Sequence, residues 1–180
     1  MTKALYMLAE FSDRDFDWLL NAGKRKTAAA ESILIKQGEP TDALYLVLAG
    51  LLVVTASVDS QIASEEIARL GPGEIAGEMS FVDARPPSAT VKAAEDSLIW
   101  VIPRSKLAAK LLQDAEFASH FYQATAVFLS DRLRTALSQL GYAKAQFAEI
   151  EPEVDPQIAD NLDLAKARLN WLLNQLRDTP

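Results

Sequence analysis

Cysteine is absent from the 180-residue chain, and histidine occurs once, as His120. The missing cysteine excludes disulfides, thiolate nucleophiles and cysteine metal sites, and it fits a reducing cytoplasm. A metal-dependent β-barrel enzyme needs several clustered histidine and carboxylate ligands, so we expect no metal site and interpret His120 as a partly buried histidine. The chain also lacks a G-x-x-x-x-G-K-[ST] loop and a nucleophile elbow around any serine. The sequence therefore predicts no catalytic residues and a protein that is not an enzyme.

Long apolar runs and an excess of positive charge are also missing. The longest apolar stretch, ALYLVLAGLLVVTA at 43–56, is interrupted by Gly50 and is shorter than the ~20 residues that cross a bilayer. The N-terminal apolar run is too short for a signal peptide. The net charge is −7 and the pI is about 4.8, whereas nucleic-acid binders usually show a basic face. We therefore predict a cytoplasmic protein with no membrane segment and no DNA partner.

A β-rich region lies between Lys26 and Pro103. Short runs rich in β-branched and aromatic residues alternate there with turn residues, and this spacing predicts a small β-sandwich or barrel. Two of the runs, ALYLV and LLVVT, are joined at Ala49-Gly50. We interpret them as a β-hairpin, because glycine can take a positive φ in a tight turn.

Helices are predicted on both sides of the β-rich region. Residues 12–22 form a short helix in this prediction, with Ser12 as its N-cap. Ser105 begins a helical tract that runs from about 105 to 140 with a break near Asp114. An apolar stripe along the tract comprises Phe117, Phe121, Ala124, Phe128, Leu133, Leu137 and Leu140. The stripe packs either against the chain's own β-core or against a partner helix, and its length favours a homodimer.

The C-terminal part of the chain is divided into a linker and a helical arm. Acids are the only charged residues at 147–163, which also contains two prolines. We therefore predict a domain at 1–140, an acidic linker at 141–156 and a C-terminal helical arm at 157–180. The arm docks on its own core, pairs with its twin or binds another protein, and the sequence leaves these three arrangements open.

The order of spaced residues in the β-rich region is specific. Gly38 follows a short strand, Tyr45 lies inside the next strand and Gly50 closes it, after which LGPGEIAGEMSF and SATVKA follow. This order resembles the cyclic nucleotide-binding domain, the β-roll of catabolite-activator-type regulators, kinase regulatory subunits and gated channels. The resemblance covers roughly residues 8–140. It implies an α+β fold, a jelly-roll-like β-roll flanked by an N-terminal helix and long C-terminal helices.

Within this resemblance, the segment GEMSFVDARPPSATV matches the family's phosphate-binding cassette. Gly77 lets the backbone approach a ligand closely. Glu78 matches the glutamate that accepts a hydrogen bond from the ribose 2′-hydroxyl, and capping of the following turn is its structural alternative. The resemblance implies cAMP or cGMP as the ligand. The predicted ligand-binding residues are Gly77, Glu78, Met79, Ser80, Arg85, Ser88 and Ala89.

One position departs from the family pattern. The family places an arginine directly before the small pair matched by Ser88 and Ala89, and this chain has Pro87 there. Proline brings neither a charge nor an N–H donor. Arg85, two residues earlier, either takes over the phosphate contact or points to solvent.

These predictions lead to two possible functions. The favoured one is a stand-alone regulatory or interaction module, homodimeric through the long helix, with a degenerate or altered pocket and a protein partner for the C-terminal arm. The alternative is a working cAMP or cGMP sensor in which Arg85 replaces the missing arginine. About 40 residues follow Gly141 and open with the acidic stretch, so we expect no helix-turn-helix module.

Overall fold

The structure, a computed structural model, describes residues 3–57, 64–83, 85–139 and 156–178. It contains two four-stranded sheets with antiparallel pairing throughout. The first sheet has the order β1 (Lys24–Ala28), β8 (Ser97–Pro103), β3 (Ala43–Ala49) and β6 (Ile75–Ala76). The second has the order β2 (Ile33–Ile35), β7 (Thr90–Ala93), β4 (Leu52–Ala56) and β5 (Glu65–Leu70). The predicted β-roll is confirmed.

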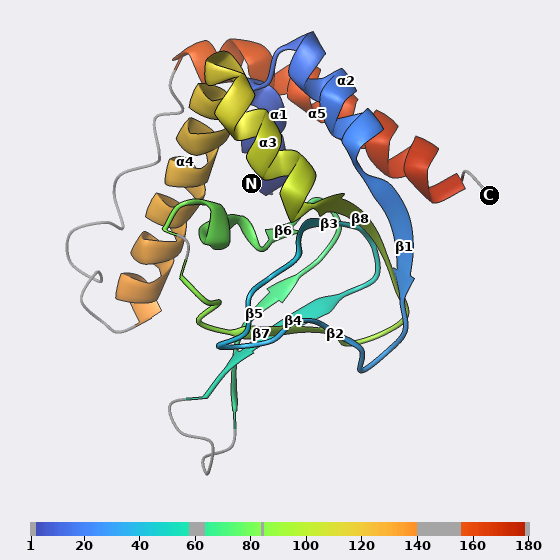
Figure 1. The fold of residues 1–180 in the computed structure, drawn as a ribbon, viewed down its shortest axis with the longest axis vertical. Helices are drawn as coiled ribbons and strands as arrows, with labels where there is room; N and C mark the ends of the chain where they lie inside the picture. The colour runs from blue at the N-terminus through green and yellow to red at the C-terminus, as the bar shows by residue number, and fades with distance from the viewer. Residues whose placement is uncertain (1–2, 58–63, 84, 140–155, 179–180) are drawn as a thin grey trace.

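Helices gather on one side of the sheets, as Figure 1 shows. They are α1 (Lys3–Glu10), α2 (Asp13–Ala22), α3 (Arg104–Gln113), α4 (Ala115–Gln139) and α5 (Pro156–Asp178), with the short 3₁₀ helix η1 (Glu78–Phe81) between β6 and β7. Ser12 caps α2 as predicted, and a reciprocal bond from its backbone N–H to Asp15 completes a capping box. The predicted α+β class is confirmed, and α1 is an additional helix that was not predicted from the sequence.

Strand β3 separates two apolar cores. Tyr45 and Val47 point into the space between the sheets, where side chains from both sheets meet. Leu44, Leu46 and Leu48 point the other way, into the core shared with the helices. Successive side chains of a strand alternate between its faces. The unbroken apolar run of β3 therefore serves both cores at once.

The predicted hairpin at Ala49-Gly50 is wrong. β3 pairs with β8 and β6, whereas β4 pairs with β5 and β7, so the chain crosses from one sheet to the other at this point. Gly50 does take the expected positive φ of +88°, and a Cβ there would lie 2.3 Å from Ser97 Oγ. The glycine correctly indicates that the chain turns here. The strand that β3 or β4 pairs with depends instead on which core its side chains must cover.

The break predicted near Asp114 is confirmed, because α3 ends at Gln113 and α4 begins at Ala115. Asp114 Oδ1 accepts a hydrogen bond from Phe117 N–H at 3.0 Å, which caps the start of α4. In the apolar stripe of α4, Phe117, Phe121, Ala124 and Phe128 are buried in the chain's own core. Leu133 is 61% exposed, and Leu140 lies outside the described residues. Homodimer formation through α4 stays a prediction.

Helix α5 packs against α1 of the same chain. Its buried face contains Ala165, Leu169 and Leu172, and Arg168 is only 9% exposed. Of the three arrangements left open by the sequence, the described residues of the arm therefore adopt docking on the chain's own core. Of the predicted acidic linker at 141–156, residues 141–155 lie outside the described residues and Pro156 begins α5. The predicted domain boundaries stay predictions.

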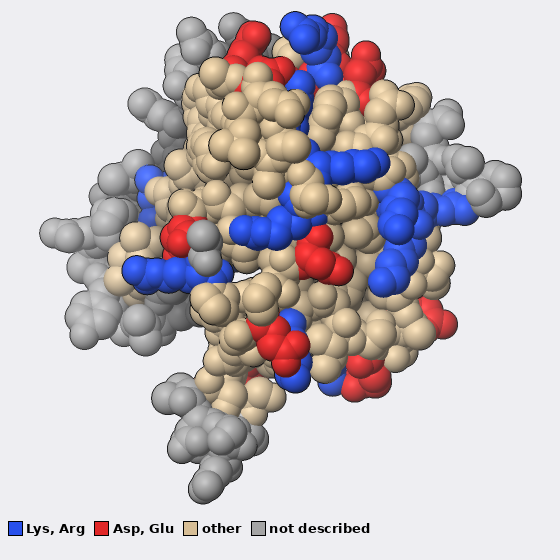
Figure 2. All heavy atoms as spheres, viewed as in Figure 1, with Lys and Arg blue, Asp and Glu red and all other residues tan. Residues whose placement is uncertain are grey.

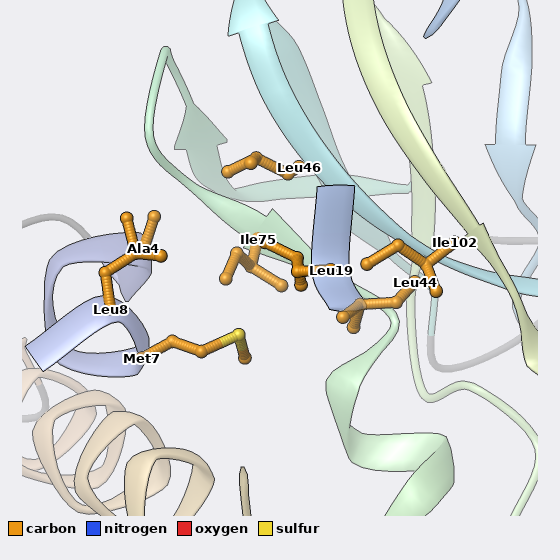
Figure 3. Close-up of a pocket in the computed structure, with 8 residues that line it drawn as sticks. All are labelled: Ala4, Met7, Leu8, Leu19, Leu44, Leu46, Ile75 and Ile102. Atoms are coloured by element: carbon orange, nitrogen blue, oxygen red, sulfur yellow. The ribbon is translucent and has the colours of Figure 1, made fainter. Parts of the chain in front are cut away.

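A small apolar cavity lies where α1 and α2 cover the first sheet. Figure 3 shows the side chains that line it, which come from α1, α2, β3, β6 and β8. Its volume is about 10 Å³, which is about the least space that holds a single water molecule, and no polar group is present to bind one. This cavity belongs to the packing of the core and is no ligand site. Among the described residues, no helix combines the length and apolar character needed to cross a bilayer.

Candidate ligand-binding site

A second, much larger cavity of about 750 Å³ opens between the second sheet, the segment around η1 and helix α4. Its size falls within the range of small-molecule pockets, roughly 300–1,000 Å³. The residues that line it are Ile35, Val54, Ile67, Ala68, Leu70, Ala76, Gly77, Glu78, Met79, Ser80, Asp83, Arg85, Pro86, Pro87, Ser88, Ala89, Val91, Asp131 and Arg132. All seven residues predicted from the sequence are among them, so the structure brings the predicted set together around one cavity. Their role in binding stays a prediction.

Gly77 shapes the entry to η1. Its φ is +93°, in the left-handed region, and a Cβ at this position would lie 2.7 Å from the Ala43 carbonyl oxygen. Only glycine satisfies both conditions without strain. The turn places Glu78, Met79 and Ser80 along the cavity wall. On the other side of η1, Arg104 Nη2 donates a hydrogen bond to Ser80 O at 2.9 Å, and its guanidinium lies 4.8 Å from the centre of the Phe81 ring.

Glu78 is 1% exposed, although it lines the cavity. Its Oε1 lies 2.9 Å from Nη1 of Arg132, which comes from α4. The same nitrogen lies 3.9 Å from Met79 Sδ. A buried carboxylate is costly unless a charge or hydrogen bonds compensate it. Glu78 therefore forms an ion pair that joins η1 to the helix over the cavity, and its predicted cap role stays a prediction.

Sequence reasoning missed Arg132. A signal was present, because Arg132 follows Phe128 by four residues and so continues the buried face of α4. A charged residue at a position where the periodicity expects an apolar side chain indicates a partner across the interface. The identity of that partner was not readable, since Glu78 lies 54 positions earlier in the chain.

Arg85 does not reach across the cavity in this structure. Its side chain is 83% exposed, and its Nε lies 3.7 Å from Asp83 Oδ2. The backbone N–H of Arg85 also donates to Asp83 Oδ1 at 3.1 Å. Pro87 stands beside it, and its carbonyl oxygen accepts a hydrogen bond from Gly38 N–H at 2.9 Å. The cassette loop is therefore held by its backbone and by Asp83, and its arginine lies at the solvent side.

Charged residues around the cavity nearly cancel. The described lining contains three carboxylates, from Glu78, Asp83 and Asp131, and two guanidinium groups, from Arg85 and Arg132, which gives a formal charge of −1. Each arginine lies within ion-pair distance of one of these carboxylates. The described lining residues therefore supply no excess positive charge to attract an anion. Figure 2 shows basic and acidic side chains spread over the same face of the molecule.

The remaining candidate, His120, lies away from the cavity. Its Nδ1 is 2.8 Å from Asp15 Oδ2, and its side chain is about one quarter exposed, at 25%. The prediction of a partly buried histidine is confirmed. Within the described ranges, no three His, Cys, Asp or Glu side chains come together as a metal site.

A two-sheet roll with a cavity between one sheet, a glycine-led turn and the trailing helix is the architecture of a ligand-binding β-roll. The family described as the cyclic nucleotide-binding domain matches residues 25–114, half of the chain. The chain therefore belongs to the cyclic nucleotide-binding domain family, and the resemblance seen in the sequence is confirmed. Domains of this family are regulatory.

Two solved structures are similar to this chain. A cyclic nucleotide-binding domain from Methylobacillus flagellatus aligns with a TM-score of 0.66 and 24% identity, covering 77% of this chain and 80% of the other. The catabolite activator protein of Thermus thermophilus aligns with a TM-score of 0.63 and 22% identity, over 96% of this chain and 87% of the other. At these identities, the similarity establishes the fold.

A curated relative is an uncharacterized NTE family protein of Mycobacterium tuberculosis, which is 24% identical over 148 residues. The alignment covers 82% of this chain but only 23% of the mycobacterial protein. This chain thus spans less than a quarter of the length of that relative.

Proposed function

We propose that the chain is a regulatory ligand-binding module whose cyclic nucleotide pocket is altered at its phosphate end. The observation that carries this proposal is the contrast within the cassette. Gly77 and Glu78 keep the geometry of a formed pocket, whereas Pro87 occupies the position of the family's arginine and Arg85 lies 83% exposed beside Asp83. The pocket is present, but its cationic contact is not in place.

The missing arginine should weaken the binding of a cyclic nucleotide. A hydrogen bond from a charged donor contributes about 1.5–3 kcal/mol, and each 1.4 kcal/mol is about a factor of ten in affinity. Without the arginine, cAMP and cGMP bind roughly one to two orders of magnitude more weakly than in a pocket that has it. The module then responds to another ligand or acts mainly through a protein partner.

The module also acts as a homodimer in this proposal. Leu133 lies on α4 beyond the buried part of the apolar stripe and is 61% exposed. An exposed leucine on a helix whose preceding turns are buried gives a second copy an apolar position to cover. The C-terminal arm carries exposed apolar side chains as well, at Leu164 and Trp171, which supports its proposed role as a surface for a protein partner.

Isothermal titration with cAMP and with cGMP, up to millimolar ligand, tests the proposal on the unaltered protein and on Pro87→Arg. We expect little or no heat from the unaltered protein and clear binding by Pro87→Arg. Micromolar binding by the unaltered protein would contradict an altered pocket. The absence of binding heat from both proteins would mean that the pocket has lost more than one ligand contact.

A second candidate function is a working cyclic nucleotide sensor. It is favoured by the cavity of about 750 Å³ and by the two arginines that line it. If Arg85 replaces the family's arginine, Arg85→Ala will remove most cyclic nucleotide binding, whereas Arg69→Ala, at an exposed arginine paired with Glu66, will leave it unchanged. Equal binding by both variants excludes this role for Arg85.

A further inference from the structure

We infer that the pocket selects an uncharged ligand with neighbouring hydroxyl groups on a largely apolar body, that is, a nucleoside in preference to its cyclic phosphate. This inference rests on the proposed function, because it takes the cavity of about 750 Å³ as the ligand site. It goes further by stating what replaces the cyclic nucleotide.

The first argument is the charge of the wall. The described lining already carries a formal charge of −1, and both of its guanidinium groups lie beside a carboxylate. A cyclic phosphate adds one more negative charge and finds no cation in excess. Like charges in a partly enclosed site repel more strongly than in water, because the local dielectric constant is lower. An uncharged ligand avoids this repulsion and the high cost of removing a charged phosphate from water.

The second argument is the apolar character of the rest of the wall. Ten of the fourteen uncharged lining residues are aliphatic or proline, and the other four are Gly77, Met79, Ser80 and Ser88. The ten are Ile35, Val54, Ile67, Ala68, Leu70, Ala76, Pro86, Pro87, Ala89 and Val91. Such a wall favours a flat or aliphatic body, with a few polar groups fixing its orientation. Pro87 thus changes the phosphate end from a charged contact to an apolar one.

The third argument is the paired polar group opposite this wall. Glu78 and Arg132 place a hydrogen-bond acceptor and a donor 2.9 Å apart. A carboxylate accepts hydrogen bonds, and a guanidinium offers five N–H donors in a fixed plane. Arg132 contacts Glu78 and Met79 through Nη1. We assign its other nitrogens to a ligand oxygen. Two neighbouring hydroxyls match this pair, one donating to Glu78 and the other accepting from Arg132.

The test compares adenosine with cAMP by isothermal titration on the unaltered full chain. The cyclic phosphate of cAMP adds a negative charge and esterifies the 3′- and 5′-hydroxyls, so only adenosine keeps the two neighbouring hydroxyls. We expect adenosine to bind at least tenfold more tightly than cAMP. We also expect 2′-deoxyadenosine to bind at least fivefold more weakly than adenosine, because it lacks one of the two hydroxyls. This ligand series tests the role of the Glu78–Arg132 pair without a variant that risks unfolding.

Pro87→Arg supplies the matched control. It should raise the affinity for cAMP at least tenfold and change that for adenosine by less than threefold. Equal or tighter binding of cAMP by the unaltered protein, or no adenosine binding at millimolar concentration, overturns the inference. If adenosine gives no binding heat while Pro87→Arg gains cAMP binding, the inference fails and the proposed function stands. If the unaltered protein binds cAMP at micromolar concentration, both fail.

Discussion

Replacing Arg168 with methionine should detach the C-terminal arm from the body of the protein. Arg168 is 9% exposed and donates through Nη1 to Leu8 O at 3.0 Å and to Phe11 O at 2.6 Å. These carbonyls lie at the end of α1, where helical carbonyls have no partner of their own. Its Nη2 also pairs with Asp13, but the Asp13 side chain is 92% exposed, so solvent screens this contact and we assign it little stability.

The expected loss follows from the two buried contacts. A hydrogen bond from a charged donor contributes about 1.5 kcal/mol at the low end of its range, so two contribute about 3 kcal/mol. Methionine keeps the length and apolar contacts of the side chain but leaves both carbonyls without this donor. A loss of about 3 kcal/mol is a large part of the roughly 5–15 kcal/mol that stabilises a typical domain.

Urea unfolding provides the assay, followed by circular dichroism and by tryptophan fluorescence, because Trp171 on α5 packs against Phe16 with ring centres 5.9 Å apart. Lys166→Met is the matched control on the same helix, since Lys166 is 53% exposed and pairs with a carboxylate that is 94% exposed. We expect the control to change the free energy of unfolding by less than about 0.5 kcal/mol. If Arg168→Met costs no more than this control, Arg168 does not hold the arm and the reasoning is refuted.

Three further predictions concern the turn, the β-core and the long helix. Gly77→Ala should lower the free energy of unfolding by about 2 kcal/mol, because alanine is strained at this φ and its Cβ would meet the Ala43 carbonyl. Urea unfolding measures this loss, and an unchanged free energy of unfolding would argue against the left-handed turn. Burial, followed by the hydrogen bond with Asp42, raises the pKa of Tyr45 above its ordinary value. The stability that neutral Tyr45 contributes is therefore fully present below about pH 10, where the unfolded side chain titrates, and is lost as the pH rises above this value. In urea unfolding between about pH 9 and 11, the free energy of unfolding should therefore fall less steeply with pH for Tyr45→Phe than for the unaltered protein. Leu133→Asp should convert a homodimer to monomers in sedimentation velocity, and a dimer that survives would place the interface elsewhere.

The sequence predicted seven residues that line one cavity, because these residues are close together in the chain. Six of the seven predicted residues follow Gly77 within twelve positions, and a local motif of this length preserves the spacing that the fold requires. The glycine at the turn and the missing arginine were both readable from this spacing alone. The wall opposite the motif was not, because Arg132 meets Glu78 across 54 positions.

Tertiary contacts explain the errors and omissions in the fold. The hairpin prediction at Gly50 failed because β3 must cover two cores, so its neighbours are β8 and β6 instead of β4. Helix α1 is eight residues long and has no acidic residue in its first turn, which leaves few local signals for its start. Helix α5 contacts the N-terminal helices partly through Arg168, whose partners lie 155 to 160 positions earlier in the chain. Such contacts leave no periodic pattern.

The double burial of β3 has a consequence for amide hydrogen exchange. This strand is paired on both edges and has an apolar core against each face. Its amides can meet solvent only when the β-roll and the helical layer have both opened, so the strand interior should exchange at the rate set by global unfolding. Edge strand β5 is paired on one side only and is mostly exposed, so it should exchange through small local openings. A deuterium-uptake profile along the chain would then distinguish a variant whose C-terminal arm detaches from one whose whole domain is destabilised. Only the second kind of variant should accelerate exchange in β3.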